Sequence, residues 1–307
     1  MTTIGEIALP QLSERISQGG VALSFGLIRV AVSSNVEPMV GAFQRLYGDF
    51  PSLPHSDSEF IDIRAVLEHG AGIRRFVRRQ VVFHADGNRP FEPFPAHTHL
   101  PLLEWGLNWT IAQRSHRYLL LHAGCIERGG RGVLFPALPG SGKSTLTAAL
   151  VHRGYRLLSD EFGAVRRSDG MLYPLLRPVA LKNESIDVIA RFAPEAKLGP
   201  RFPKTRKGTV SHMAPPRDSV LRVKEPVAPS LVIFPKFISG ATVELEPMPR
   251  SFAFAKLASN SFNYEILGPE GFSTLVKLAL SCDCYRLTYG SLDQAIEVID
   301  RLVVRDL

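Results

Sequence analysis

Hydrophobic and polar positions along the first third of the chain predict a small α+β module. Residues 21–32 are mostly apolar and rich in β-branched side chains, and residues 59–68 alternate as a strand does. Residues 37–47 carry apolar side chains at helical spacing, and another strand is expected at about residues 79–84. The first third therefore combines one helix with several strands.

An amphipathic helix is predicted over residues 102–118, after a proline-rich stretch at residues 88–101. Trp105 and Trp109 stand four residues apart, so they lie on the same face of this helix. Large aromatic side chains at this spacing are typical of a buried core. We expect both tryptophans to pack inside the protein.

From Tyr118 onward strands and helices alternate, which predicts an α/β domain with a central mixed sheet covered by helices. A boundary near residues 110–117 divides the chain into an N-terminal α+β module, residues 1–115, and a larger domain, residues 116–307. Strands are expected at residues 118–127, 131–138, 155–161, 177–183, 231–237 and 241–248. Helices are expected at residues 143–154, 251–257, 269–281 and 291–303.

The composition is that of an ordinary globular protein of 307 residues, with 45% hydrophobic and 21% charged residues. No segment approaches the roughly 20 apolar residues of a spanning helix, and the first residues lack the pattern of a secretion signal. We therefore expect a cytoplasmic protein without membrane insertion. The three cysteines fit neither a disulfide framework nor a four-cysteine zinc site.

The positive charge is local: of a net charge of +7, residues 201–224 carry seven basic residues and one acid, a balance of +6. No motif for reading DNA or RNA accompanies this charge, so a nucleic-acid partner is not expected. The segment lacks apolar periodicity and contains three prolines. It is therefore expected to be irregular, either a functional lid or binding loop containing Arg201, Lys204, Arg206, Lys207 and His212, or a solvated insertion.

A glycine-rich loop follows the predicted strand at residues 131–138 and precedes a predicted helix, which is the context of a phosphate-binding loop. Its expected nucleotide-binding residues are Pro139, Gly140, Ser141, Gly142, Lys143, Ser144 and Thr145. Glycines let successive N–H groups face phosphate oxygens, the lysine binds the β- and γ-phosphates, and the serine hydroxyl binds magnesium. Ala137 stands at the position of the usual first glycine, from which it differs only by a methyl group.

Two acidic residues, Asp160 and Glu161, follow the loop at the end of the next predicted strand. Asp160 comes 17 residues after Lys143, at the end of the next predicted strand, so it should emerge at the sheet edge that carries the loop. Glu161 would point to the opposite side unless the strand ends there. Two neighbouring acids can divide the work of phosphoryl transfer, since one accepts a proton from the attacking hydroxyl and the other helps to hold magnesium.

The segments LHAG, PGSGKST and LLSDE resemble the catalytic core of the HPr kinase/phosphorylase family, and most closely the HPr-kinase-related kinases. The resemblance covers residues 118–190 and implies a P-loop kinase fold similar to that of phosphoenolpyruvate carboxykinase. It implies transfer of the γ-phosphate of ATP to a protein serine. By position, Asp160 would be the catalytic base, His122 its neighbour and modulator, Lys143 a catalytic phosphate ligand, and Ser144 a magnesium ligand, with Glu161 beside it.

The chain also departs from this family. Glu161 stands where HPr kinase has a second aspartate, and the glycine-rich signature that supplies another magnesium acid is absent. In its place stand residues 177–189, which include Lys182 and Glu184. Kinase chemistry is therefore expected rather than phosphorylase chemistry.

The sequence leaves the acceptor open. It is a serine of a peptide or small carrier protein, or a small molecule such as free serine or a sugar. The third alternative is a nucleotide-gated regulatory module that hydrolyses little ATP. Homo-oligomerisation is also left open.

Overall fold

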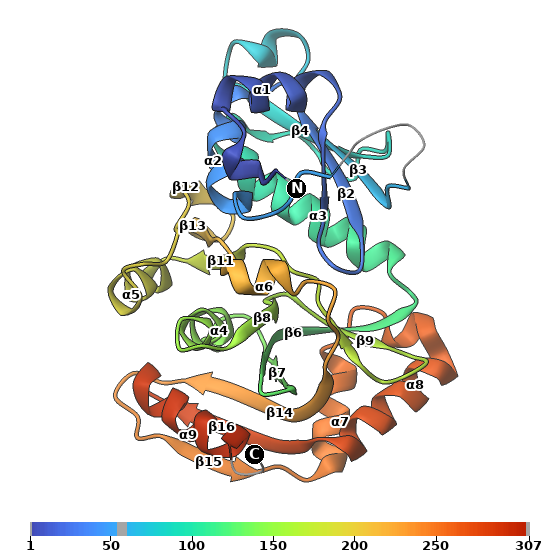
Figure 1. Ribbon diagram of the computed structural model, residues 1–307, viewed down its shortest axis with the longest axis vertical. Helices are drawn as coiled ribbons and strands as arrows, with labels where there is room; N and C mark the ends of the chain where they lie inside the picture. The colour runs from blue at the N-terminus through green and yellow to red at the C-terminus, as the bar shows by residue number, and fades with distance from the viewer. Residues whose placement is uncertain (1, 54–59, 305–307) are drawn as a thin grey trace.

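The structure is a computed structural model that describes residues 2–53 and 60–304, and within these residues the strands form three sheets. Figure 1 shows the N-terminal sheet at the top of the view, a three-stranded sheet below it and the largest sheet beneath. The sheets contain parallel and antiparallel pairs, so the predicted α/β class with mixed sheets is confirmed.

The N-terminal sheet has five strands in chain order, and its helices pack beside it. The strands are β1 (Val21–Ser24), β2 (Arg29–Ser34), β3 (Ile63–His69), β4 (Gln80–Ala85) and β5 (Phe94–Pro95). The helices are η1 (Ile4–Glu6), α1 (Leu9–Gln18), α2 (Glu37–Tyr47), η2 (Gly72–Arg75), η3 (Ala96–Thr98) and α3 (His99–Arg114). The predicted helix at residues 37–47 is confirmed, and the predicted strand at 59–68 is β3, although Glu59 lies outside the described residues.

The largest sheet has the order β10-β9-β6-β7-β14-β16-β15, with β8 also paired to β6. Its strands are β6 (Tyr118–Arg128), β7 (Arg131–Pro136), β8 (Arg156–Ser159), β9 (Phe162–Arg166), β10 (Leu172–Tyr173), β14 (Ala228–Phe237), β15 (Glu244–Pro247) and β16 (Asp283–Tyr289). Strands β7, β14 and β16 run parallel to one another, so their carboxyl ends meet at one edge.

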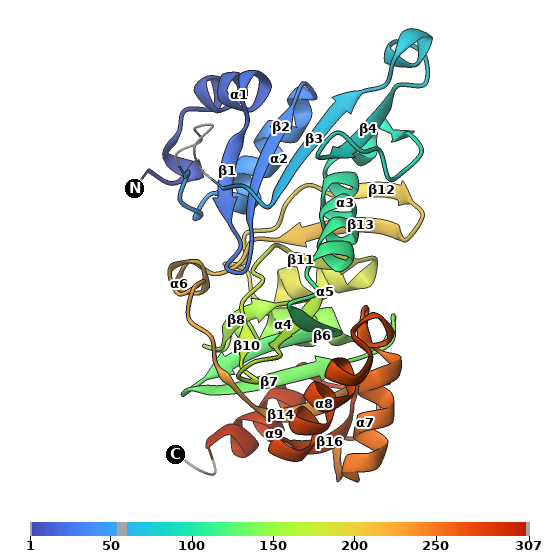
Figure 2. The ribbon, with the colours of Figure 1, turned by 90° about the vertical axis from the view of Figure 1, so that its right-hand side faces the viewer.

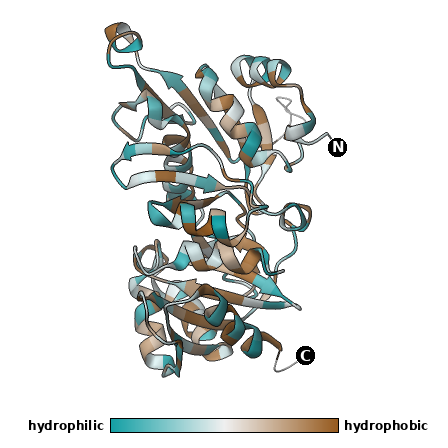
Figure 3. Ribbon diagram, turned by 90° about the vertical axis from the view of Figure 1, so that its left-hand side faces the viewer, coloured by the Kyte–Doolittle hydropathy of each residue, from teal (hydrophilic) through white to brown (hydrophobic). Residues whose placement is uncertain are grey.

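Helices cover both faces of this sheet. Helices α4 (Lys143–Val151) and α9 (Leu292–Val304) pack on one face, and α7 (Arg250–Ser259) and α8 (Tyr264–Ser281) pack on the other. Successive side chains of β7 alternate between these layers, since Leu134 joins the cluster under α8 and Phe135 the cluster under α4. Figure 3 shows hydrophobic stretches gathered on the strands between the helices.

The third sheet has the order β11-β13-β12 and lies between the N-terminal sheet and the largest sheet (Figure 2). Its strands are β11 (Val179–Lys182), β12 (Phe202–Thr205) and β13 (Gly208–Met213), accompanied by α5 (Glu184–Phe192) and α6 (Arg217–Leu221). The prediction of an irregular segment at residues 201–224 was therefore wrong. The strand pattern is hidden because Ser211 and His212 are polar and yet buried.

One continuous cluster of buried side chains joins the N-terminal module to the rest of the chain. It includes Leu103 and Leu107 of α3, Leu176 before β11 and Met213 of β13. The turn between β1 and β2 adds a backbone contact, because the N–H of Leu176 donates to the carbonyl of Phe25 at 2.8 Å. The N-terminal module is therefore packed against the segment that leads into the third sheet.

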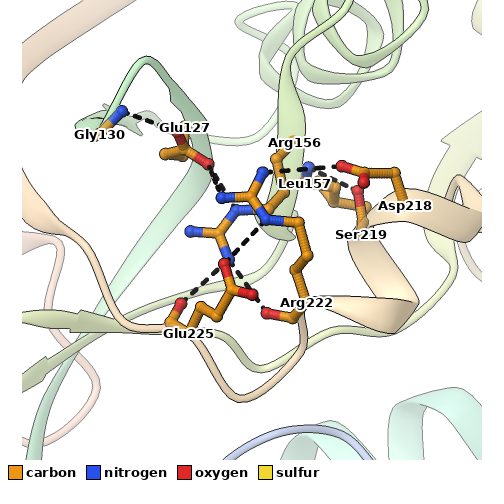
Figure 4. Close-up of polar contacts among 8 residues, drawn as sticks. All are labelled: Glu127, Gly130, Arg156, Leu157, Asp218, Ser219, Arg222 and Glu225. Atoms are coloured by element: carbon orange, nitrogen blue, oxygen red, sulfur yellow. Dashed lines mark hydrogen bonds and ion pairs between the residues drawn. The ribbon is translucent and has the colours of Figure 1, made fainter.

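A buried ion network fixes the start of β8, as Figure 4 shows. The Glu127 carboxylate at the end of β6 accepts from Arg156 Nε at 2.6 Å and lies 3.2 Å from Arg222 Nη2. Arg156 also donates to the carbonyls of Arg222 and Glu225, each at 3.0 Å. Arg156 and Glu127 are almost fully buried, and burying either charge alone would cost much free energy. Each residue therefore depends on the opposite charge of the other.

No helix within the described residues is both long enough and apolar enough to cross a lipid bilayer.

Candidate functional site

The glycine-rich loop lies at the edge where β7, β14 and β16 end. The N–H of Phe237, the last residue of β14, donates to the carbonyl of Ser141 at 3.0 Å. The hydroxyl of Tyr289, the last residue of β16, donates to the carbonyl of Gly142 at 3.3 Å. Three parallel strand ends thus support the loop, and neither Phe237 nor Tyr289 could be found from the local motif.

The two loop glycines have the backbone conformation that the motif requires, with φ of +87° at Gly140 and at Gly142. A methyl group on Gly142 would lie 2.5 Å from the Tyr289 hydroxyl and 2.9 Å from Cβ of Phe237. Gly140 has open space around its Cα instead. Ala137 is nearly buried where β7 leaves the sheet, so its methyl group is accommodated.

Helix α4 begins at Lys143, directly after the loop, with Ser144 and Thr145 in its first turn. The first N–H groups of a helix have no acceptors within the helix and can bind an anion. Pro139 precedes the two glycines at the exposed side of the loop. The predicted nucleotide-binding residues therefore form one continuous loop and helix start.

Lys143 and Asp160 meet at the base of this loop. The Lys143 ammonium donates to the backbone carbonyl of Asp160, and its Nζ lies 3.8 Å from Asp160 Oδ1. Both side chains are buried. Asp160 Oδ1 has no hydrogen-bond partner among the described residues, which is unusual for a buried carboxylate oxygen and is typical of a group that meets a ligand.

The strand that carries the two acids is interrupted at Asp160 and Glu161. Ser159 pairs with Cys125, and Phe162 pairs with His122, so β8 and β9 follow β6 on either side of the break. The Ser159 hydroxyl accepts from the N–H of Glu161 at 3.3 Å and of Phe162 at 3.1 Å. Because regular pairing stops here, both acids line the same cavity, and the alternation expected of an unbroken strand does not apply.

His122 lies beside Glu161, with 3.6 Å between Nε2 and Oε1. Burial, followed by the positive charge of Lys143, lowers the pKa of His122, which favours a neutral imidazole. Burial would raise the pKa of Glu161, but the positive charges of Lys143, Arg177 and Lys182 outweigh it and the pKa is lowered. Glu161 is therefore held as a carboxylate.

The segment from Asn260 to Asn263 holds the strand on which His122 stands. Asn260 Nδ2 donates to the carbonyl of His122 at 2.7 Å, and its own carbonyl accepts from the N–H of His122 at the same distance. Asn263 Oδ1 accepts from the N–H of Leu120 at 2.9 Å. The polar character of this segment is visible in the sequence, but its partners, about 140 positions earlier, are not.

A small polar cavity of about 40 Å³ lies beside Asp160 and Glu161. Its walls come from α3, from the junction of β8 and β9, from β11 and from the β12–β13 hairpin, and none of the predicted loop residues lines it. It is enough for a few water molecules and too small for a nucleotide. The residues that line it include Trp105, Asn108, Arg177, Lys182, Lys207 and His212.

The two tryptophans are not in the core, contrary to the sequence prediction. Trp109 is 44% exposed, and Trp105 lines the cavity. The core face of α3 is formed instead by leucines, among them Leu103 and Leu107. Both tryptophans belong to α3, but Trp105 faces the polar cavity and the ring of Trp109 packs edge-on against Phe91.

The basic residues at 201–212 are divided among different surroundings. Lys207 and His212 line the cavity, while Arg201 forms an ion pair with Asp187 away from it. The guanidinium of Arg206 lies over the ring of Phe94. In residues 177–189, which stand where the family has its glycine-rich signature, Lys182 lines the cavity and Glu184 does not.

The residues beside the loop offer oxygen donors that suit magnesium, the ion that the sequence predicts here. Within the described residues, no group of three or more His, Cys, Asp or Glu side chains is arranged to hold a metal ion by itself. Magnesium in phosphotransfer sites needs one or two protein ligands together with phosphate oxygens and water. Ser144 at the start of α4, the unpartnered oxygen of Asp160 and the carboxylate of Glu161 are oxygen donors of the required kind.

No protein-family model matches the chain, and no curated protein matches it in sequence.

Proposed function

We propose that the chain is an ATP-dependent phosphotransferase with the architecture of a P-loop kinase of the HPr kinase type. The observation that carries this proposal is the buried Asp160 carboxylate, whose free oxygen lies 3.8 Å from Lys143 Nζ at the base of a phosphate-binding loop. A loop that bound nucleotide for a purely structural purpose would not need, beside its lysine, a buried acid with a carboxylate oxygen that accepts no hydrogen bond.

In the proposed reaction Asp160 accepts the proton of an acceptor hydroxyl. The hydroxyl oxygen forms a bond to the γ-phosphorus of ATP, and the bond from this phosphorus to the bridging oxygen of ADP breaks. Lys143 and the N–H groups at the start of α4 stabilise the negative charge of the transferring group. His122 is a neutral neighbour that orients Glu161, in agreement with its lowered pKa.

Ser144 and Glu161 would hold magnesium together with the phosphates of ATP. The ion would supply neutralisation of charge on the β- and γ-phosphates. The chain's own part is to provide oxygen donors next to the loop and to keep Glu161 ionised.

The shape of the cavity favours a small acceptor or a single inserted side chain. An extended peptide needs an open groove, whereas the cavity beside Asp160 is narrow and lined by converging polar groups. A small-molecule kinase is therefore the second candidate function, next to a kinase of a serine on a peptide or carrier protein. Both candidates use the same base and the same phosphate loop.

The test is to incubate the protein with magnesium and γ-labelled ATP in a dialysed lysate and, separately, in the small-molecule fraction of that lysate. Label transferred to a protein or to a metabolite identifies the acceptor class. Lys143→Ala should abolish the transfer, because the cation that binds the β- and γ-phosphates is removed. Absence of a labelled product from both fractions would reject the kinase and favour a regulatory module.

A further inference from the structure

The cavity beside Asp160 is built by both halves of the chain. Helix α3 of the N-terminal module contributes Glu104, Trp105 and Asn108, and they face Asp160 and Glu161 across the cavity. This wall belongs to an element that the sequence assigns to a separate module. If the loop and the acids carry out the chemistry, the N-terminal module forms part of the surface that the acceptor touches.

Arg177 fixes the position of this wall. Its guanidinium donates to the Asn108 side-chain carbonyl, and its Nη2 lies 3.6 Å from Glu104 Oε2. Glu104 is itself buried and accepts from the Tyr47 hydroxyl. Burial raises the pKa of Glu104, and the charge of Arg177 opposes that rise. This buried contact holds α3 in register with the segment leading into β11.

Two other cations line the cavity without such partners. Within the described residues, neither Lys182 nor Lys207 has a carboxylate oxygen within 4.0 Å of its ammonium. The Lys207 ammonium lies 5.6 Å from the centre of the Trp105 ring, at the tip of the β12–β13 hairpin. Burial, and after it the charge of Lys207, lowers the pKa of Lys182. The charges of Glu161 and Asp160 oppose this lowering without overcoming it, so an anion bound beside Lys182 would stabilise its ammonium further.

The remaining titratable group in the wall adds no charge. His212 is fully buried, and its pKa is lowered to about 3 by burial and by the charges of Arg177 and Lys182, so it is neutral near pH 7. The cavity is thus polarised: carboxylates stand on the wall at the β8–β9 junction, and cations stand on the walls formed by β11 and the hairpin. Glu161 and Asp160 supply part of the counter-charge of Lys182, and an anionic group on the acceptor would supply more.

We infer that the acceptor carries an anionic group, a carboxylate or a phosphate, next to the hydroxyl that is phosphorylated, and that Lys182 and Lys207 bind this group while Trp105 packs against the acceptor. The inference rests on the proposed phosphotransferase function and narrows its substrate class. Its two sources are an acidic residue beside a serine in a peptide and a free hydroxy acid or phosphorylated metabolite.

Trp105 provides a direct probe, because the chain has two tryptophans and the other, Trp109, is 44% exposed. In a Trp109→Phe protein the fluorescence reports Trp105 alone. The probes are D-glycerate with glycerol as its neutral counterpart, and the blocked dipeptide Ser-Asp with blocked Ser-Asn. Each is titrated in the presence of magnesium and a non-hydrolysable ATP analogue.

We expect the anionic member of at least one pair to change the fluorescence and to bind about tenfold or more tightly than its neutral counterpart. The pair that does so distinguishes a small-molecule acceptor from a peptide. Lys182→Gln should remove the difference, and Lys224→Gln, at an exposed lysine outside the cavity, should preserve it. Equal binding of anionic and neutral probes, or a difference that survives Lys182→Gln, would overturn the inference.

Transfer of label is measured with the same protein variants and acceptors in separate samples, in which γ-labelled ATP replaces the non-hydrolysable analogue, so that the two proposals fail separately. Efficient transfer to neutral and anionic acceptors alike would overturn the inference and leave the kinase intact. Binding of anionic probes that depends on Lys182, without any transfer, would reject the kinase and retain the anion site.

Discussion

The buried pair of Glu127 and Arg156 should be a main support of the strand that presents Asp160. In Glu127→Gln the shape of the side chain is kept, but the Arg156 guanidinium, whose side chain is 3% exposed, loses the carboxylate at 2.6 Å. Removing one member of a buried ion pair costs about 3–5 kcal/mol. Glu225 at 3.8 Å and two backbone carbonyls at 3.0 Å still face Arg156, so a cost near 3 kcal/mol is expected.

The assay is urea unfolding at pH 7, followed by circular dichroism, with Glu225→Gln as the matched control. The Glu225 side chain is 55% exposed, so its loss should cost less than about 1 kcal/mol. Burial would raise the pKa of Glu127, but the N–H of Gly130 and the charge of Arg156 outweigh this and lower it. The stabilisation by Glu127 is therefore present above pH 4.5 and is lost as the pH falls further, so the difference between wild type and Glu127→Gln should narrow there.

Equal costs for Glu127→Gln and Glu225→Gln, or a difference from wild type that is independent of pH, would refute this reasoning. Either result would mean that β8 is held by its strand pairing with β6 and that the ion network adds little.

Two further predictions concern the loop and the cavity wall. Gly142→Ala should abolish binding of a fluorescent ATP analogue, because the loop has a φ of +87° at this residue, which alanine rarely adopts, and the added methyl group would lie 2.5 Å from the Tyr289 hydroxyl. Ala137→Gly should bind the analogue within about twofold of wild type, and similar affinities for both variants would contradict the geometry of the loop. The pKa of His212 is lowered from 6.5 to about 3 in the folded protein, so as the pH falls His212 is protonated in the unfolded chain before it is protonated in the folded one. The free energy of unfolding of the wild type should therefore fall by about 2 kcal/mol between pH 7 and pH 5 because of this group. Denaturation of His212→Gln at both values should show a correspondingly smaller loss, and an unchanged loss would mean that His212 is accessible to protons in the folded state.

The sequence predicted the part of the site that is local. The strand, glycine loop, helix and second strand follow one another without interruption, so their spacing alone brought Lys143 and Asp160 to one sheet edge. The position of Glu161 depended on whether the strand continued, and the break after Ser159 is stabilised by a side-chain hydrogen bond that has no sequence pattern of its own.

The acceptor side of the site depends on contacts between distant segments. Trp105, Lys182 and Lys207 converge because α3 packs against the third sheet, and no periodicity in the chain predicts that packing. The β12–β13 hairpin was missed because a buried serine and a buried histidine interrupt its apolar alternation. In the same way, Tyr289 supports the loop from a strand whose neighbours are known only from the sheet order.

The catalytic role of Asp160 is tested most directly by measuring ATP affinity and phosphate transfer on the same Asp160→Asn protein, with Asp293→Asn at an exposed position as the control. Because asparagine keeps the shape but cannot accept the acceptor proton, transfer should fall by about 10²–10⁴-fold while ATP binds nearly as in wild type. Transfer within tenfold of wild type, with ATP still bound, would contradict the assignment of Asp160 as the base.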